Sequence, residues 1–354
     1  MGTKRNKRAK KLIKSLMYGI IIIFFLWVIY QNLEDFQTLA STIQRVKPFL
    51  LLNTILLGLG NFVIYSFIFQ KSFQTISEET KYPKLLTKTI VYHFLSISNP
   101  LGVTGGSAYL VKYAVERGLS HIKAVFGLLV TNLSTNLAYL SILIFTLYSL
   151  NLSNRLELYQ WYAAFVIFAI ILGIILALAF FIILPKFSGN VAHTVARIIN
   201  RIVKPVIGRE LLSDRTIEDY TNEARTLSSR FDKSIYKFLQ SLPISLAYHG
   251  INVLILFLSF YAFDILIPIS KIMTLYGVIT LFTVVSPTPQ GLGIVEGLAQ
   301  TAAVSVQIPG SGAILAILIY RLAVLWIPAL LGLLLFRYAH TEKVVNVQKA
   351  APSS

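Results

Sequence analysis

Two side chains in the last third of the chain carry charge within otherwise apolar sequence. Glu296 lies in the segment Ser286–Gly297 (SPTPQGLGIVEG), and Arg321 lies in the apolar run Ala313–Phe336. Charge inside a membrane is costly and is mostly retained for a partner or a ligand. An arginine guanidinium donates two parallel hydrogen bonds to a phosphate group. The two residues therefore predict a site for an anionic group, with lipid phosphate as the natural ligand.

The segment around Glu296 also breaks the hydrophobic pattern, because two prolines and three glycines fall within it. In lipid, a broken helix leaves backbone groups unpaired, so such breaks occur inside protein or beside a water-filled cavity. We expect a short helix to restart near Gly291, with the positive end of its dipole toward an anionic head group.

The composition defines the class of protein that must position these residues. The 354 residues are 55% hydrophobic and 13% charged, with a mean hydropathy of +0.69. A soluble domain has roughly a quarter of its residues charged, so we predict a polytopic membrane protein. The net charge is +17, but the basic residues lie in loops beside hydrophobic runs, as in cytoplasmic loops, so we expect no nucleic-acid partner. The sequence contains no cysteine, which excludes disulfides and thiolate sites.

Six apolar runs are long enough to cross a membrane as helices, which takes about 20 residues. Two further apolar stretches carry Pro and Gly near their centres, so each is predicted to be a pair of short helices that enters and leaves on one side. The predicted fold class is an all-α polytopic membrane protein with six full spans and two re-entrant hairpins, or eight spans if the hairpins are counted. The spans are Leu16–Tyr30, Pro48–Phe69, Ala124–Leu150, Trp161–Leu184, Phe238–Phe263 and Ala313–Phe336, and the hairpins are Leu85–Val115 and Ile272–Val306.

The distribution of positive charge predicts the orientation. With both hairpins re-entrant, 27 of the 32 Lys and Arg residues fall on one side of the membrane and four on the other. Cytoplasmic loops carry the excess of positive charge. We therefore predict a multi-pass protein of the plasma (inner) membrane with both termini in the cytoplasm. Residues 1–338 form one membrane domain, and 339–354 a disordered cytoplasmic tail.

The same arrangement predicts an internal repeat. The tripeptides at 100–102 and 289–291 share a Pro-x-Gly pattern, and a shift of 189 residues aligns them and places Asn132 on Arg321. Repeat 1 (about 48–150) then begins outside and repeat 2 (about 237–337) inside. Inverted repeats are typical of secondary transporters, which bind substrate at the repeat interface near the midplane. Coincidence is the alternative, because Pro-x-Gly is a weak pattern.

Polar residues within the other spans have two interpretations. Thr104 and Ser107 at the first hairpin tip, Asn99–Ser107, are candidate helix caps or ligands, although this tip is equally a tightly packed bend. Other polar side chains either line a site or join helices by hydrogen bonds. They are Asn53, Asn61, Tyr65, Ser134, Thr135, Asn136, Tyr139, His249 and Asn252.

The long loop Pro185–Lys237 is predicted to be cytoplasmic. Val191, Val195 and Ile198 recur at helical spacing, while Arg197 and Arg201 occupy the other side, as in a basic helix at a membrane surface. A loop whose charge only sets topology is the alternative. Residues 210–234 are predicted to form a soluble helical segment.

Several kinds of chemistry lack the residues that they require. The sequence has no Walker A motif, GLGIVE lacks the third glycine of a dinucleotide motif, and the five histidines lack metal-ligand spacing. We therefore expect no cofactor, no metal and no catalytic residues of a hydrolase.

At its two Pro-x-Gly segments the chain resembles the lysylphosphatidylglycerol synthase transmembrane-region family, the membrane half of the multiple peptide resistance factor. The matching features are SNPLGVTGGSAY, SPTPQGLGIVEG, and Arg321 followed by Pro328 and Gly332, over about residues 10–338. The resemblance implies a flippase-like fold that moves phospholipid across the inner membrane. It also implies that Glu296 and Arg321 are central to the site, and that Gly291, Gly293, Pro289 and the first hairpin tip shape the cavity.

Bifunctional members of that family carry an aminoacyl transferase domain after the membrane part, whereas this chain ends at Ser354 without one. We therefore expect a translocator of a lipid with an anionic phosphate head group rather than an enzyme. An integral-membrane transferase that uses Glu296 as a base, and a transporter of a soluble anion, are the alternatives. Membrane phospholipid is the expected partner, and a homo-oligomer and a separate lipid-modifying enzyme are left open.

Overall fold

The computed structural model describes most of the chain between residues 46 and 337. The described ranges are 46–75, 84–99, 103–152, 158–183, 185–207, 212–230, 235–286, 288–308 and 310–337, with positions 23, 30, 37 and 210. The predicted first span Leu16–Tyr30 lies outside them apart from positions 23 and 30, and so do the tripeptide at 100–102 and the tail at 339–354.

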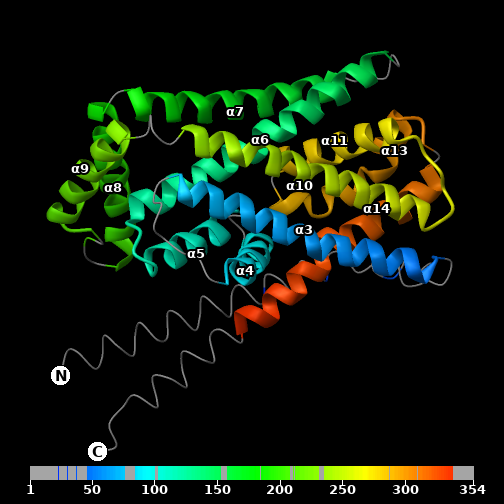
Figure 1. Ribbon diagram of the computed structural model, residues 1–354, viewed down its shortest axis with the longest axis horizontal. Helices are drawn as coiled ribbons and strands as arrows, with labels where there is room; N and C mark the ends of the chain where they lie inside the picture. Colours follow the sequence, from blue (N-terminus) through cyan, green and yellow to red (C-terminus); the bar gives the residue numbers. More distant parts are fainter. Residues whose placement is uncertain are drawn as a thin grey trace, which may run out of the picture.

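The regular elements in these ranges are all helical, and four of them are long and apolar enough to cross a membrane. Each coincides with a predicted span, so these four predictions are confirmed by length and composition. They are α3 (Pro48–Gln74), α6 (His121–Leu152), α10 (Ile235–Tyr261) and the continuous helix that begins with α14 (Gly310–Arg321) and runs to residue 337. The chain is thus a polytopic membrane protein (Figure 1).

Shorter apolar helices complete the membrane part. The helix α7 (Leu158–Ile183) falls on the predicted span Trp161–Leu184, and its fully described apolar stretch is Phe165–Leu176. The first predicted hairpin is formed by α4 (Leu85–Ile97) and α5 (Val103–Val115), which pack against each other.

The second hairpin differs from the prediction in its returning arm. After α11 (Ile269–Val285) comes a 3-10 turn, Pro289–Gly291, and the helix restarts at Ile294 rather than near Gly291. The restarted helix α12 (Ile294–Gly297) has four residues and is followed by α13 (Ala299–Ser305). Closely spaced glycines explain the shift, because Gly291 and Gly293 have positive φ values of 70° and 77° that a helix cannot contain.

The order of elements supports the predicted repeat. The sequence α3, α4, α5, α6 is matched by α10, α11, α12 with α13, and α14, and α6 and α14 begin 189 residues apart, at His121 and Gly310. Figure 1 shows α3 and α10 side by side and running in opposite directions, as inverted units require. At one end of this pair, Lys47 before α3 forms an ion pair with Asp264 after α10, which raises the pKa of Lys47 through its hydrogen bond.

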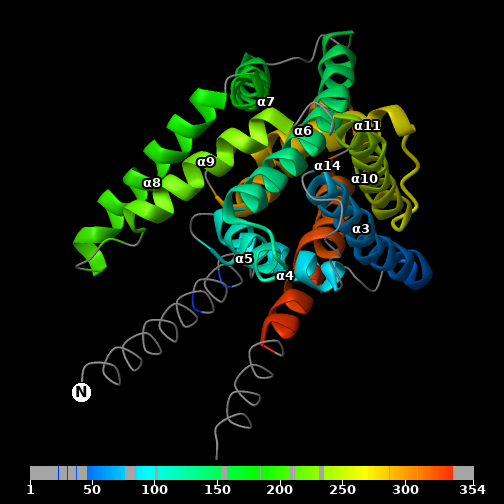
Figure 2. The same cartoon turned by 60° about the vertical axis from the view of Figure 1, so that its left-hand side comes forward.

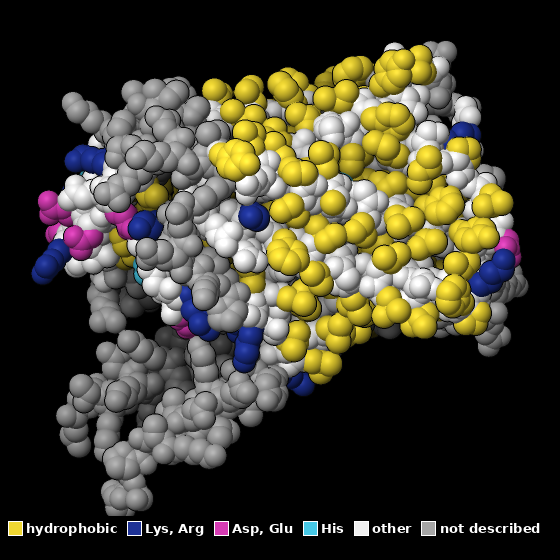
Figure 3. Space-filling view, viewed as in Figure 1, with side chains coloured by type: hydrophobic (Ala, Val, Ile, Leu, Met, Phe, Trp, Pro, Cys, Tyr) yellow, Lys and Arg dark blue, Asp and Glu magenta, His cyan; other side chains and the backbone are white. Residues whose placement is uncertain are grey.

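Charged side chains gather at the two ends of the molecule. The helices α8 (Pro185–Ile207) and α9 (Asp214–Arg230) pack side by side at one end, as Figures 1 and 2 both show. Most of the Lys, Arg, Asp and Glu side chains in Figure 3 lie at that end, and the band between the ends is mostly hydrophobic. On α8, Val191, Val195 and Ile198 are exposed, as a helix at a membrane surface would be.

The two hairpins meet inside the molecule. Leu292, from the loop of the second hairpin, packs in one buried cluster with Val91 and Phe94 of α4. The cluster continues into the helix after Arg321 through Leu325 and Trp326. The first hairpin and the loop of the second are therefore both brought next to the helix that carries Arg321.

A polar cavity around Arg321

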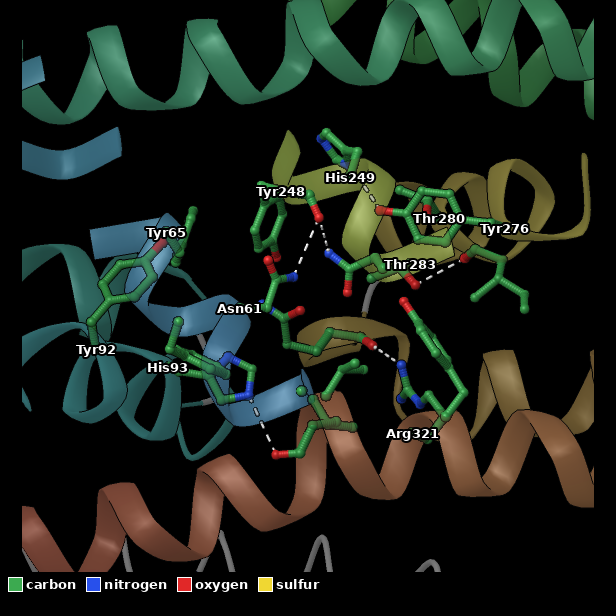
Figure 4. Close-up of a pocket in the computed structure, with 18 residues that line it drawn as sticks. Asn61, Tyr65, Tyr92, His93, Tyr248, His249, Tyr276, Thr280, Thr283 and Arg321 are labelled. Carbon is green, nitrogen blue, oxygen red and sulfur yellow. Dashed lines mark hydrogen bonds between the residues drawn. The ribbon is translucent and has the colours of Figure 1, made fainter. Parts of the chain in front are cut away.

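A cavity of about 200 Å³ lies between α3 and α4 on one side and α10, α11 and α14 on the other. Its volume is large beside the roughly 10–15 Å³ that one water molecule needs. Figure 4 shows side chains from α3 and α4 on one side and from α10, α11 and the Arg321 helix on the other. The lining residues are Gly58, Asn61, Phe62, Tyr65, Tyr92, His93, Tyr248, His249, Asn252, Tyr276, Ile279, Thr280, Thr283, Gln290, Tyr320, Arg321, Val324 and Leu325.

Arg321 supplies the fixed charge of this cavity, because no other lining residue in the described part of the chain is Lys, Arg, Asp or Glu. Its Nε donates to Glu296 Oε1 at 2.7 Å, and its Nη1 donates to the backbone carbonyl of Gln290 at 3.0 Å. The Arg321 and Glu296 side chains are only 5% and 4% exposed. The third nitrogen, Nη2, is buried and has no hydrogen-bond partner among the described residues.

Glu296 holds Arg321 in place but does not itself line the cavity. Its Oε1 accepts from Arg321, and its Oε2 accepts from the backbone N–H of Gly293 at 3.0 Å. That second bond caps α12, so the N–H group predicted to meet a head group is already paired with a carboxylate. The prediction that this helix N-terminus faces an anionic head group is therefore wrong. The helix has four residues, and the N–H group at its N-terminus donates to Glu296.

The turn Pro289–Gly291 places the second hairpin against Arg321. Gln290 has a left-handed backbone, with φ of 55°, and its carbonyl thereby reaches the guanidinium. There is no space for a side chain at Gly291, because a Cβ there would lie 2.8 Å from Val295 and 3.0 Å from the backbone of Thr283. The Pro-Gln-Gly sequence thus serves to bring one backbone acceptor to the buried arginine.

The helix that carries Arg321 changes its winding directly after it. Residues Leu322–Trp326 form a π-helical segment, a feature that is frequent at functional sites. Nε2 of His93, on α4, donates to the Leu325 carbonyl at 3.3 Å. Gly58 of α3 lies so close to this segment that a Cβ would be 2.4 Å from the Ala323 carbonyl oxygen. The helices α3 and α4 therefore each contact the irregular segment.

The rest of the cavity wall is built largely from amides, tyrosines and a histidine. Asn61 and Asn252 both donate to the backbone carbonyl of Tyr248, at 3.3 and 2.9 Å. His249 joins three helices, because its Nδ1 lies 2.6 Å from the Tyr276 hydroxyl and its Nε2 donates to the Thr135 carbonyl of α6 at 3.1 Å. These bonds fix polar groups deep in the protein without adding charge.

This arrangement is suited to binding an anionic oxygen. A buried donor without a partner costs about 1–3 kcal/mol, and more when charged, so Nη2 of Arg321 gains from any acceptor that enters the cavity. Glu296 and Gln290 orient the guanidinium and leave Nη2 as its nitrogen without a partner among the described residues. Among the described residues, His, Asp and Glu form no group of three that could hold a metal ion.

The predicted site residues separate into two groups in the structure. Arg321 and Glu296 are in contact, and Pro289, Gly291 and Gly293 form the loop around them. The others lie elsewhere: Asn132 donates to Leu128 of its own helix, Asn99 packs against Gly105, and Thr104 and Ser107 follow on α5. None of these four residues lines the cavity.

Most of the cavity wall was not predicted from the sequence. Two interpretations were open for Asn61, Tyr65, His249 and Asn252, and the tyrosines of α4, α11 and α14 were not identified. A periodic signal could have identified some of them. Tyr276, Thr280 and Thr283 recur at helical spacing on α11, so they mark one polar face of an apolar helix.

Comparison with known proteins identifies one family. The family model described as the lysylphosphatidylglycerol synthase TM region matches residues 15–332, which covers most of the chain and both halves of the cavity. No curated protein matches the sequence.

Proposed function

The chain belongs to the lysylphosphatidylglycerol synthase TM region family, and from this premise we propose that it translocates a phospholipid with an anionic phosphate head group across the plasma membrane. The head group enters the cavity between the repeat units, and the acyl chains stay in lipid. The family is described by its transmembrane region, and residues 15–332 match that region. A phospholipid cargo fits a transmembrane protein because it is itself part of the membrane.

The observation that carries the proposal is the unpaired Nη2 of Arg321. The side chain is 5% exposed, Glu296 and Gln290 fix it, and Arg321 is one of the residues that line the cavity. A buried arginine that served only to pair with Glu296 would not need to line a cavity. A lipid phosphate supplies the acceptor and accounts for the cavity beside it.

The arrangement of the two units fits a transport cycle. The cavity receives residues from α3 and α4 on one side and from α10, α11 and α14 on the other. In transporters built from inverted repeats, one unit moves against the other around a site at their interface. We propose that both hairpins are re-entrant and that the cavity opens alternately to the two leaflets.

A transferase that uses Glu296 as a general base has less support. Both carboxylate oxygens already accept hydrogen bonds, one from Arg321 and one from the Gly293 N–H. A base must present an oxygen to the proton that it removes. The geometry makes Glu296 a residue that orients Arg321.

The experiment that tests the proposal is transport in liposomes. Purified protein is reconstituted with a panel of phospholipids labelled on the acyl chain, and their movement between leaflets is followed by quenching of the outer label. We expect the wild-type chain to accelerate movement, and Arg321→Met to lose at least about 90% of that rate, since about 1.4 kcal/mol changes a rate tenfold.

The matched control is Arg215→Met, the same change on exposed α9. It should transport at the wild-type rate. Full transport by Arg321→Met, or equal losses in both variants, would show that the arginine binds no lipid phosphate.

A further inference from the structure

A second buried group without a partner lies in the same cavity as Arg321. The side-chain oxygen of Asn61, on α3, has no hydrogen-bond partner among the described residues, although Asn61 is only 4% exposed and its amide donates to Tyr248. Asn61 and Arg321 come from different repeat units and line one cavity. Two of the residues that line the cavity thus each carry a buried group without a partner among the described residues, an acceptor on Asn61 and a cationic donor on Arg321.

Tyrosine rings lie in this part of the cavity. Tyr65 stacks on Tyr248 with ring centroids 5.0 Å apart, and Tyr92 lies 6.3 Å from Tyr65. Figure 4 shows Tyr65 and Tyr92 on the side of the cavity away from Arg321. These rings pack against one another, and the side-chain oxygen of Asn61 is a buried acceptor in the same wall that lacks a partner among the described residues.

The balance of charge points to the same kind of ligand. Arg321 is paired with Glu296, so the pair is neutral before any ligand binds. A phosphate alone would bring an uncompensated negative charge into a buried site, which is costly. A head group with both a phosphate and an ammonium adds no net charge.

We propose that Asn61 is a specificity-determining residue that accepts a hydrogen bond from the ammonium N–H of a zwitterionic head group whose phosphate binds Arg321. This inference rests on the proposed function and names its substrate class. A quaternary ammonium carries no N–H, so it leaves the Asn61 oxygen unpaired. The site therefore selects primary ammonium lipids over their N-methylated counterparts.

The test compares two lipids that share charge and phosphate. Phosphatidylethanolamine and phosphatidylcholine, each with the same label on one acyl chain, are added in trace amounts to phosphatidylcholine liposomes that contain the full chain. We expect the wild type to move the ethanolamine lipid about tenfold faster. That factor corresponds to about 1.4 kcal/mol, near the value of one hydrogen bond to a charged group.

Three variants identify the residue responsible. Asn61→Leu should bring the rate ratio close to one, while Asn61→Asp keeps an acceptor and should retain the preference, which provides a test even if the leucine variant does not fold. Asn252→Leu is the matched control, because Asn252 is equally buried and donates to the same Tyr248 carbonyl, and no buried atom of its side chain lacks a partner. It should change both rates alike and leave the ratio at the wild-type value.

The outcomes separate the two proposals. A wild-type chain that moves neither lipid overturns the proposed function and this inference with it. A chain that moves both lipids equally, or an Asn61→Leu variant that keeps the wild-type ratio, overturns the inference alone.

Discussion

At the scale of single residues, the structure explains why a carboxylate and an arginine persist in apolar sequence. Glu296 uses one oxygen to hold Arg321 and the other to cap α12, so it fixes both the charge and the loop that shields it. Breaking a buried ion pair is costly because it leaves the partner charge uncompensated, typically by 3–5 kcal/mol. Glu296 is therefore needed for the protein to fold with Arg321 buried.

We predict that Glu296→Gln strongly lowers stability, by roughly 3–5 kcal/mol, since Arg321 then lies buried without a counter-charge. Thermal unfolding of the purified protein in detergent measures this loss. Glu296→Gln combined with Arg321→Met should recover most of it, because neither charge remains. A single variant as stable as the wild type would contradict the structural role assigned to the pair.

Residue types alone identified this pair because charge is rare at such depth. Glu296 and Arg321 were predicted to belong to one site. Asn132, which the predicted repeat aligns with Arg321, instead donates a hydrogen bond within its own helix. Tyrosines such as Tyr248 and Tyr320 could not be assigned from sequence, because their rings also suit an apolar core. Only the fold brings them together around one cavity.

At the scale of elements, α3 approaches the π-helical segment through a glycine. A Cβ on Gly58 would lie 2.4 Å from the carbonyl oxygen of Ala323, and a backbone atom cannot move aside as the end of a side chain can. A Cβ on Gly60, two residues later, would meet nothing within 4 Å beyond the backbone of its own helix. The two glycines provide a matched comparison.

We predict that Gly58→Ala destabilises the protein by roughly 1–3 kcal/mol through overpacking. Gly60→Ala should be neutral or should stabilise by up to about 1 kcal/mol, because alanine favours a helix more than glycine does. Unfolding midpoints of the two variants in the same detergent test this difference. Equal midpoints would mean that α3 does not approach the π-helical segment this closely.

Helices were predicted well and the breaks between them less well. Spans such as α3 and α6 follow from length and hydropathy, which the apolar membrane interior imposes directly. The restart at Ile294 follows the positive φ values of Gly291 and Gly293, and the π-helical segment Leu322–Trp326 packs against α3 and α4, and hydropathy records neither feature. The break in the second hairpin was therefore predicted correctly and the conformation of its loop was not.

At the scale of the whole molecule, the proposed transport cycle requires two units of opposite orientation. The helix order, the spacing of α6 and α14 and the opposite directions of α3 and α10 all support this arrangement. The charge distribution of the sequence predicts which end is cytoplasmic, and the helices alone carry no such information. Orientation thus remains a prediction that follows from the positive-inside rule.

We predict that the α5–α6 turn and the α10–α11 turn lie on opposite sides of the membrane. The chain contains no cysteine, so single cysteines at Arg117 and at Leu266 report one position each. A membrane-impermeant thiol reagent applied to intact cells should label the Leu266→Cys variant, and the Arg117→Cys variant only after the membrane is opened. Labelling of both from outside would contradict the inverted arrangement.

The most direct test of the central claim is lipid transport by the Glu296→Gln, Arg321→Met double variant. Because this variant has no unpaired buried charge, it should fold, which unfolding in detergent verifies before reconstitution. If Arg321 binds the lipid phosphate, the folded double variant moves acyl-labelled phospholipid no faster than protein-free liposomes do. If the folded double variant transports at the wild-type rate, the ion pair is a structural element only, and the cavity does not use Arg321 to bind phosphate.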